Sequence, residues 1–210
     1  MTGTQRREQL LQVGRSLFAR KGFDGTSIEE IASEAGVSKP VVYEHFGGKE
    51  GLYEVVVDRE VQSLLRSFTA ALVGTSPREL LEQATLALLT YVEEHADGFR
   101  ILVREPPVAG SASSGFATLI SDVAARVEHI LAAQLAARGF RTAFAGLYAQ
   151  ALIGQVALVG QWWLDRVHLE AEAPPGRDMV AAHLVNLAWN GLSALESEPR
   201  PVRSAPPGTS

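Results

Sequence analysis

The chain has 210 residues and a mass of 22.6 kDa, enough for one domain or for a small module joined to a larger one. Hydrophobic residues make up 46%, charged residues 20% and the formal net charge is −5, which disfavours collagen-like, coiled-coil and disordered classes. There is no cysteine, so disulfide scaffolds, thiolate zinc sites and cysteine nucleophiles are excluded. The first residues lack the apolar core of a secretory signal, and we therefore expect a cytoplasmic protein.

Helical periodicity runs through nearly the whole chain, and strand signals are scarce, so we predict an all-α protein of about nine helices. The first helix is expected over 4–21, with Leu10 and Leu17 on one apolar face and a glycine at position 22 to end it. The next helix begins after Ser27, because Glu30 lies three residues later and completes a capping box. Gly36 keeps that helix short.

A third, very short helix is predicted after Ser38, a natural N-cap, with Pro40 tolerated in its first turn. Val42 and Phe46 lie four residues apart and are expected to face the core. The remaining side chains of this helix are basic, aromatic or small and face outward. Two short helices joined by a tight glycine turn predict a helix-turn-helix, whose second helix enters the DNA major groove.

The run SIEEIASEAGVSKPVVYEHF over 27–46, followed by GGKEGL, resembles the N-terminal domain of the tetracycline-repressor-like (TetR) transcription regulators. The likeness extends over 7–52 and combines several short motifs at fixed spacing. It implies a small DNA-binding domain, a larger helical domain for ligand and dimer contacts, and repression relieved by a small molecule. One departure is Gly48, where the family more often has a serine or asparagine to cap the fourth helix.

The resemblance implies a role in DNA binding for nine residues, of which the alternative interpretation is an ordinary solvated helix surface. Four would lie near base edges: Lys39, Pro40, Val41 and Glu44. Five would contact phosphates: Ser27, Ser38, Tyr43, His45 and Lys49. The first 50 residues contain seven Lys or Arg and seven Asp or Glu, so non-specific affinity for DNA is expected to be modest and dependent on salt.

The rest of the chain is typical of a helical bundle. Further helices are expected over 49–73, 76–95, 98–105 and 116–138, with a Gly/Ser/Ala loop at 108–115. We predict a helix-turn-helix domain over 1–50, a ligand-binding and dimerisation domain over 51–198 and a disordered tail over 199–210.

The segment 142–164 carries no charge and is long enough to span a bilayer, which leaves a membrane-associated or adaptor protein as the alternative function. Three glutamines within it, at 150, 155 and 161, argue against lipid. We instead expect this segment and the last helix to form a four-helix bundle in a homodimer, or otherwise an intrasubunit core. The residues predicted for that interface are Ala145, Ala149, Gly154, Ala157, Leu184, Leu187, Gly191 and Leu195.

A small apolar effector is the expected ligand of the larger domain, because several aromatic and aliphatic residues can line an apolar cavity with a few polar groups. The candidates, each of which also fits an ordinary core position, are Phe99, Leu102, Val103, Phe116, Leu119, Val123, Tyr148, Gln155, Trp162 and Trp163. The five histidines are scattered singly, and no phosphate-binding glycine loop occurs. We therefore expect no catalytic activity, no cofactor and no metal.

Overall fold

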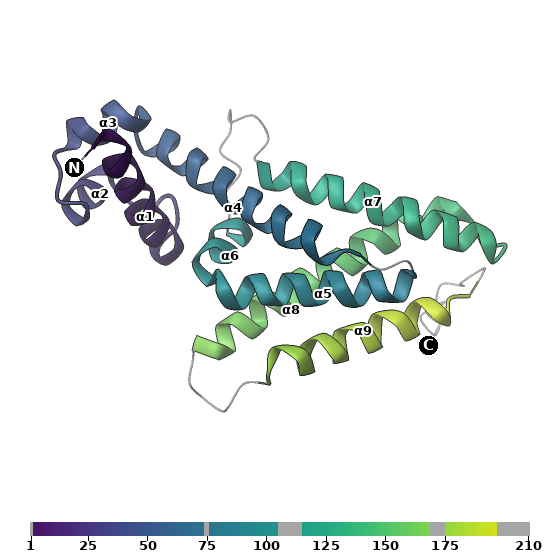
Figure 1. Cartoon of the computed structure of the whole chain (residues 1–210). Helices are drawn as coiled ribbons and strands as arrows, with labels where there is room; N and C mark the ends of the chain where they lie inside the picture. The colour runs from purple at the N-terminus through teal and green to yellow at the C-terminus, as the bar shows by residue number, and fades with distance from the viewer. Residues whose placement is uncertain (1, 74–75, 105–114, 169–174, 197–210) are drawn as a thin grey trace, which may run out of the picture.

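The computed structural model describes residues 2–73, 76–104, 115–168 and 175–196, and these are helical with no strand (Figure 1). The all-α prediction is confirmed. The predicted tail over 199–210 lies outside the described residues. The helices are α1 (Gly3–Lys21), α2 (Ile28–Glu34), α3 (Lys39–Phe46), α4 (Lys49–Ala71), α5 (Pro77–Glu94), α6 (Ala96–Val103), α7 (Gly115–Ala137), the 3-10 turn η1 (Thr142–Phe144), α8 (Ala145–His168) and α9 (Arg177–Ser193).

Side-chain caps set the starts of several helices. Ser27 accepts a hydrogen bond from the Glu30 amide, and the Glu30 carboxylate accepts one from the Ser27 amide, so the predicted capping box is present. Ser76 and Glu79 form the same pair at the start of α5. Thr2 forms a third box with Gln5 at the start of α1, which the sequence analysis did not identify.

The N-terminal helices pack around a small core that also includes the first turns of α4. Leu10, Ile31, Val42 and Leu52, one from each of the four helices, are fully enclosed. Phe46 packs against this core from the end of α3. Val42 and Phe46 thus occupy the core positions predicted for them, and Val41 also packs against the core from its edge.

Two glycines make the turn between α3 and α4. Gly47 is left-handed, with φ of 73°, and ends α3, while Gly48 has φ of 146° and precedes α4. Any residue with a side chain would be strained in either conformation, so glycine suits both positions, including position 48, where the resemblance implies serine or asparagine. The departure at Gly48 therefore has a backbone reason, even though α4 begins without a side-chain cap.

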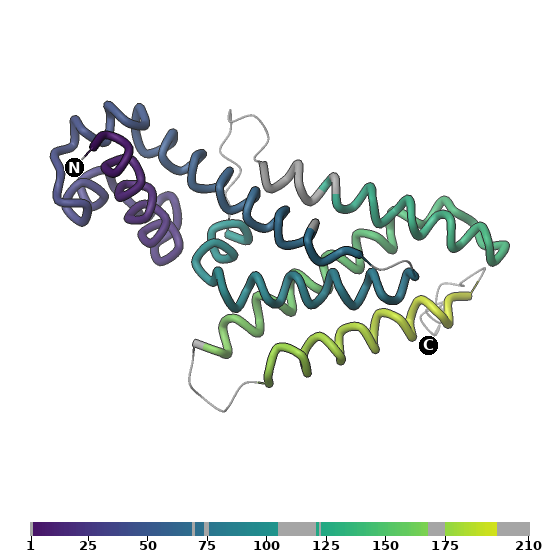
Figure 2. Tube along the Cα trace, viewed as in Figure 1, coloured from purple at the N-terminus to yellow at the C-terminus, as the bar shows by residue number. Residues whose placement is uncertain are grey.

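Helix α4 leads from the N-terminal helices into the larger bundle, and α6 packs against α1 where the two parts meet (Figure 2). Within the bundle, α7 and α8 pack together, α5 packs against α9, and α4 lies against both α5 and α7. The N-terminal helices are therefore joined to the bundle by covalent continuity through α4 and by packing through α6.

Three residues predicted for a subunit interface are buried within the chain. Ala145 and Ala149 of α8 are buried within the subunit, and Leu184 of α9 belongs to the core cluster. Their place in a subunit interface stays a prediction, because the structure holds one subunit. Leu187 and Gly191 are exposed, whereas Gly154, Ala157 and Leu195 are partly buried.

A long apolar face of α8 remains uncovered. Leu147 and Leu158 are 64% and 67% exposed, and Trp162 is exposed beside them. The stretch Thr142–Val167 is long and apolar enough to cross a membrane: an 18-residue window within it has a mean hydropathy of 1.5, yet only 17% of that window is buried within the subunit. An exposed apolar surface of this extent indicates a contact with lipid or with a second protein surface.

Candidate nucleic-acid interface

Helices α2 and α3 form a helix-turn-helix. The turn runs from Ala35 to Ser38, and it closes with a hydrogen bond from the Val37 amide to the Ala32 carbonyl at 2.9 Å. Gly36 has φ of 62°, a conformation that favours glycine. The turn places the start of α3 beside the start of α2, as the ion pair between Lys39 and Glu29 shows.

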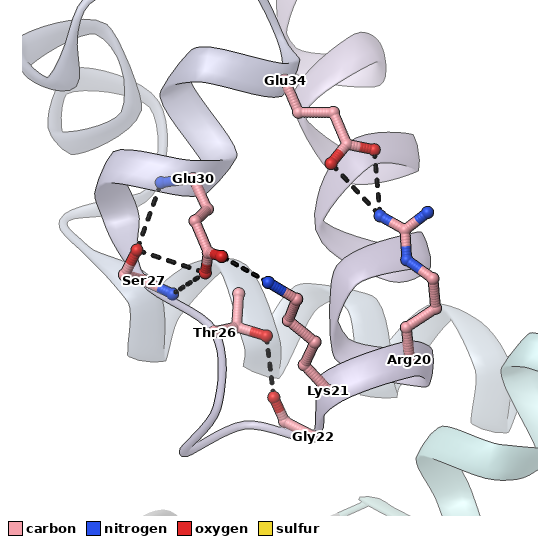
Figure 3. Close-up of polar contacts among 7 residues, drawn as sticks. All are labelled: Arg20, Lys21, Gly22, Thr26, Ser27, Glu30 and Glu34. Atoms are coloured by element: carbon pink, nitrogen blue, oxygen red, sulfur yellow. Dashed lines mark hydrogen bonds and ion pairs between the residues drawn. The ribbon is translucent and has the colours of Figure 1, made fainter.

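Polar contacts hold α2 against α1 (Figure 3). The Arg20 guanidinium donates to both carboxylate oxygens of Glu34 at 3.2 Å, and Lys21 pairs with Glu30. Thr26, which is buried, donates from its hydroxyl to the Gly22 carbonyl at 2.8 Å. Both ion pairs are exposed and add little stability each, so they orient α2 more than they strengthen the domain.

The outer surface of α3 carries most of the residues predicted to contact DNA. Lys39, Pro40, Tyr43 and Glu44 are exposed there, while Val41 and His45 are half-buried along its edges. Ser38 is at the N-cap position, exposed, and its side chain makes no capping hydrogen bond. Ser27 lies at the start of α2, with its hydroxyl engaged by Glu30. The structure thus brings seven of these eight residues onto α3 and its N-cap, and places Ser27 at the start of α2.

Lys39, predicted to read a base, forms an ion pair with Glu29 in the free protein. The hydrogen bond from Lys39 holds the pKa of the Glu29 carboxyl below its ordinary value, so Glu29 is ionised at neutral pH. Glu29, Glu30 and Glu34 on α2 each neutralise one cation of the N-terminal part. These charges are visible in the sequence, but their pairing depends on contacts between helices.

Replacing Glu29 by glutamine is expected to strengthen binding to DNA of arbitrary sequence by about threefold near 0.1 M salt, because Lys39 is freed and a negative charge is lost. The plot of log affinity against log salt concentration should steepen by about 0.9. Fluorescence anisotropy with a scrambled duplex measures both. Glu82→Gln is the matched control, since it removes the same charge from an exposed pair with Arg78 on α5. Equal affinities for Glu29→Gln and the unmodified protein would contradict the expectation.

Lys49 has a structural role that sequence reasoning missed. Its ammonium group donates to the Phe23 carbonyl at 3.0 Å and lies 4.1 Å from the centre of the Phe23 ring. It therefore fastens the start of α4 to the segment between α1 and α2. A contact with phosphate, which the resemblance implies, would have to be made from this partly buried position.

Arg7 is a second residue that the analysis did not single out. Its guanidinium lies 4.5 Å from the centre of the Phe46 ring, so it links α1 to the end of α3. One of its terminal nitrogens, Nη1, is buried without a hydrogen-bond partner. The cluster of basic residues near the N-terminus was the available signal, but the aromatic partner lies 39 positions further along the chain.

The residues predicted to line an effector cavity fall into three groups in the structure. Phe99, Leu102 and Trp163 are buried in the core cluster, and Val103 and Val123 pack against it. Tyr148 and Gln155 are partly buried, and Trp162 is exposed under the Arg166 guanidinium. The side chains of Phe116 and Leu119 lie outside the described residues. Phe99 approaches α8 at Gly160, where a methyl group would lie 3.5 Å from the Phe99 ring.

No group of three or more His, Cys, Asp or Glu that could hold a metal occurs in the described parts of the chain. The polar residues that do gather lie on α3 and the adjacent helix starts. A helix-turn-helix whose second helix presents exposed polar side chains is typical of one class of DNA-binding proteins, and the structure places this chain in that class.

Comparison with known proteins gives the family. The model described as "Bacterial regulatory proteins, tetR family" matches residues 10–56, and the "Tetracyclin repressor-like, C-terminal domain" model matches residues 77–191. The chain therefore belongs to the TetR family of transcriptional regulators. The predicted family is confirmed.

Individual proteins match along most of the chain. The HTH-type transcriptional activator FasR of Mycolicibacterium smegmatis is 31% identical over 198 residues, which cover 90% of this chain and 84% of that protein. A TetR-like regulator from Rhodococcus sp. RHA1 superposes with a TM-score of 0.69 at 29% identity, over 90% of this chain and 97% of that one. AibR, solved in complex with isovaleryl coenzyme A and operator DNA, has a TM-score of 0.72 at 18% identity, covering 87% and 97%.

Proposed function

We propose that the protein is a transcriptional repressor, which binds an inverted-repeat operator as a homodimer and is released by an apolar small molecule. The proposal rests on the presence of two different exposed surfaces on one chain. One is the exposed face of α3, and the other is the uncovered apolar face of α8 and α9. A dimer formed through the second surface would present two copies of the first to DNA.

The proposed roles of the residues on DNA follow from the resemblance to the TetR family. Lys39, Val41 and Glu44, with Pro40 between them, would lie near base edges, where they can donate to guanine, pack on a thymine methyl and accept from cytosine. Phosphate contacts would come from the residues at the margins of α3: Ser27, Ser38, Tyr43, His45 and Lys49. Phosphate contacts set register, and base contacts set sequence preference.

The dimer would be formed by α8 and α9 of each subunit. Leu147 and Leu158 on α8 and Leu187 on α9 are exposed. A methyl group at Gly154 or Gly191 would meet nothing within 4 Å, so each glycine leaves room for a helix of the partner to approach. Ala157 and Leu195, partly buried in the subunit, would lie at the edges of this interface. Burial of these faces in water would supply the driving force for association.

An apolar effector, with an acyl thioester of coenzyme A as the first class to test, is proposed for the larger domain. Support comes from the apolar character of the cluster around Phe99 and Trp163 and from AibR, whose complex holds isovaleryl coenzyme A. Trp162, Trp163 and Trp189 are the three tryptophans, so their fluorescence reports binding. Quenching by acyl-coenzyme A esters, through their apolar acyl chain, is expected; a response only to coenzyme A without an acyl chain, or only to metal ions, would contradict the proposal.

Selection of bound sequences from a random duplex pool tests the DNA proposal. We expect enrichment of an inverted repeat whose half-sites are about 34–36 Å, or a multiple of this, apart. Anisotropy on the selected duplex at two salt concentrations then separates specific from non-specific affinity. Enrichment of single half-sites only, from folded protein, would contradict a dimer on DNA.

Repression is tested with transcription in vitro from a promoter that carries the selected repeat. The protein is expected to lower transcript yield, and the effector is expected to restore it. Activation is the competing outcome, and FasR is an activator. An increased transcript yield would therefore mean that the protein is an activator and not a repressor, and it would leave the DNA-binding proposal unchanged.

The membrane-associated or adaptor alternative rests on the hydropathy of Thr142–Val167. A protein that is soluble and dimeric without detergent would exclude it, because the same apolar face would then be covered by the second subunit.

A further inference from the structure

A buried carboxylate lies where the N-terminal helices meet the bundle. Glu60, in the middle of α4, is 7% exposed. Its Oε1 accepts a hydrogen bond from Arg15 Nε of α1 at 2.6 Å, and its Oε2 accepts one from the Tyr91 hydroxyl of α5 at 2.8 Å. Helix α6 passes so close at Gly98 that an added Cβ would lie 1.8 Å from Oε2. Four helices thus meet at one carboxylate.

Both partners of Glu60, Arg15 and Tyr91, donate hydrogen bonds to its carboxylate and keep their protons. Burial, together with the neighbouring negative charge of Glu60, raises the pKa of Tyr91 well above its usual range, so its hydroxyl keeps its proton. Arg15 is always charged and donates along a fixed direction from its planar guanidinium. The carboxylate is therefore held from two sides, and its two hydrogen bonds constrain the angle between α1 and α5.

In this ion pair Glu60 is buried, whereas the side chain of Arg15 is 32% exposed. A buried carboxylate is an expensive way to stabilise a fold, since apolar side chains of similar volume often do as well or better. What such a pair adds is a requirement for one geometry, because a carboxylate displaced from its donors is left buried and unpaired. Because Glu60 lies where α1 meets the bundle, the geometry that its hydrogen bonds require is one orientation of α1 relative to the bundle.

A second ion pair joins the same two helices and provides the comparison. Arg59 of α4 donates to both carboxylate oxygens of Glu8 of α1, at 2.7 and 2.8 Å. Both side chains are half-exposed, so solvent competes for each group and a change of angle costs little. The two pairs thus differ in burial rather than in the helices that they connect.

We propose that Glu60 is a positioning residue, which fixes the N-terminal helices relative to the bundle and thereby sets the half-site spacing that the dimer accepts. The inference rests on the proposed function, since spacing has meaning only for a dimer on an inverted repeat. Rigid placement of α1 carries α2 and α3 with it, because Leu10, Ile31 and Val42 of the three helices share one core. The distance between the two recognition helices then depends on the angle held at Glu60.

The test uses duplexes that carry the selected half-site as an inverted repeat at a series of spacings, and the full-length protein. One base pair moves a half-site by about 3.4 Å along the axis, and the unmodified protein is expected to prefer one spacing by about tenfold over its neighbours. In Glu60→Gln this preference should fall to about threefold or less, whereas affinity for an isolated half-site stays within about twofold. Glu8→Gln, the matched control, should retain the full preference.

Tyr91→Phe provides a second variant in case Glu60→Gln fails to fold, because it removes one hydrogen bond and leaves the ion pair with Arg15 in place. It should weaken the spacing preference in the same direction and leave half-site affinity unchanged. A merely structural role would lower the melting temperature without changing the spacing profile. An unchanged profile in whichever of the two variants folds overturns the inference alone. If the unmodified protein selects no inverted repeat, the proposed function falls first.

Discussion

A single methyl group at position 98 is expected to lower the free energy of unfolding by about 3 kcal/mol, because it overpacks a buried polar cluster. In Gly98→Ala the new Cβ would lie 1.8 Å from Glu60 Oε2 and 2.8 Å from the Tyr91 hydroxyl oxygen. Neither group can retreat without leaving its partner. At this chain length the melting temperature should fall by roughly 6–12 °C, measured by circular dichroism.

Gly160→Ala is the matched control for this prediction. Gly160 is also a buried helical glycine, but its added Cβ would meet the Phe99 ring at 3.5 Å, an ordinary contact. Alanine favours the helix by about 0.5–1 kcal/mol over glycine, so no loss of stability is expected. If both variants melted at the same temperature, α6 would not approach Glu60 as closely as described.

Charged substitutions on the exposed faces of α8 and α9 are expected to convert the proposed dimer into folded monomers. Leu158→Glu and Leu187→Glu each place a carboxylate in the middle of an apolar surface, which must then be desolvated on association. Because both side chains are about two-thirds exposed, the subunit itself should keep its helicity and melting behaviour. Affinity for the inverted repeat should fall by about 100-fold or more, since each recognition helix then binds alone.

Val73→Glu is the control, because Val73 is 76% exposed just after the end of α4 and lies outside both faces. Sedimentation equilibrium should find monomers for the two interface variants and dimers for the control. Dimers in all three proteins would place the subunit interface elsewhere.

The helices and the helix-turn-helix could be predicted because their determinants are local. Ser27 with Glu30, and Ser76 with Glu79, mark helix starts within four residues of sequence, and the structure has both capping boxes. The short α3 is recognisable because Val42 and Phe46, four residues apart, lie on its core side. Interactions of this range are encoded in neighbouring residues, so a single sequence suffices to read them.

Contacts between distant residues escaped prediction for the opposite reason. Nothing near Glu60 in the sequence indicates that Arg15, 45 positions earlier, is its partner. In α8, hydrophobicity on nearly every side gives no periodicity by which to tell an inward face from an outward one. The sequence therefore does not tell whether Ala145 and Ala149, which are buried within the subunit, face its own core or a partner.

The close approach of α6 to Glu60 also has an evolutionary consequence. A side chain at position 98 and a full-length carboxylate at position 60 compete for the same space, so related proteins should rarely carry both. Where a relative has alanine or serine at the position of Gly98, we expect a shorter residue at the position of Glu60. Loss of the carboxylate should in turn release the positions of Arg15 and Tyr91 to vary. We therefore expect positions 15, 60, 91 and 98 to change together as related sequences diverge.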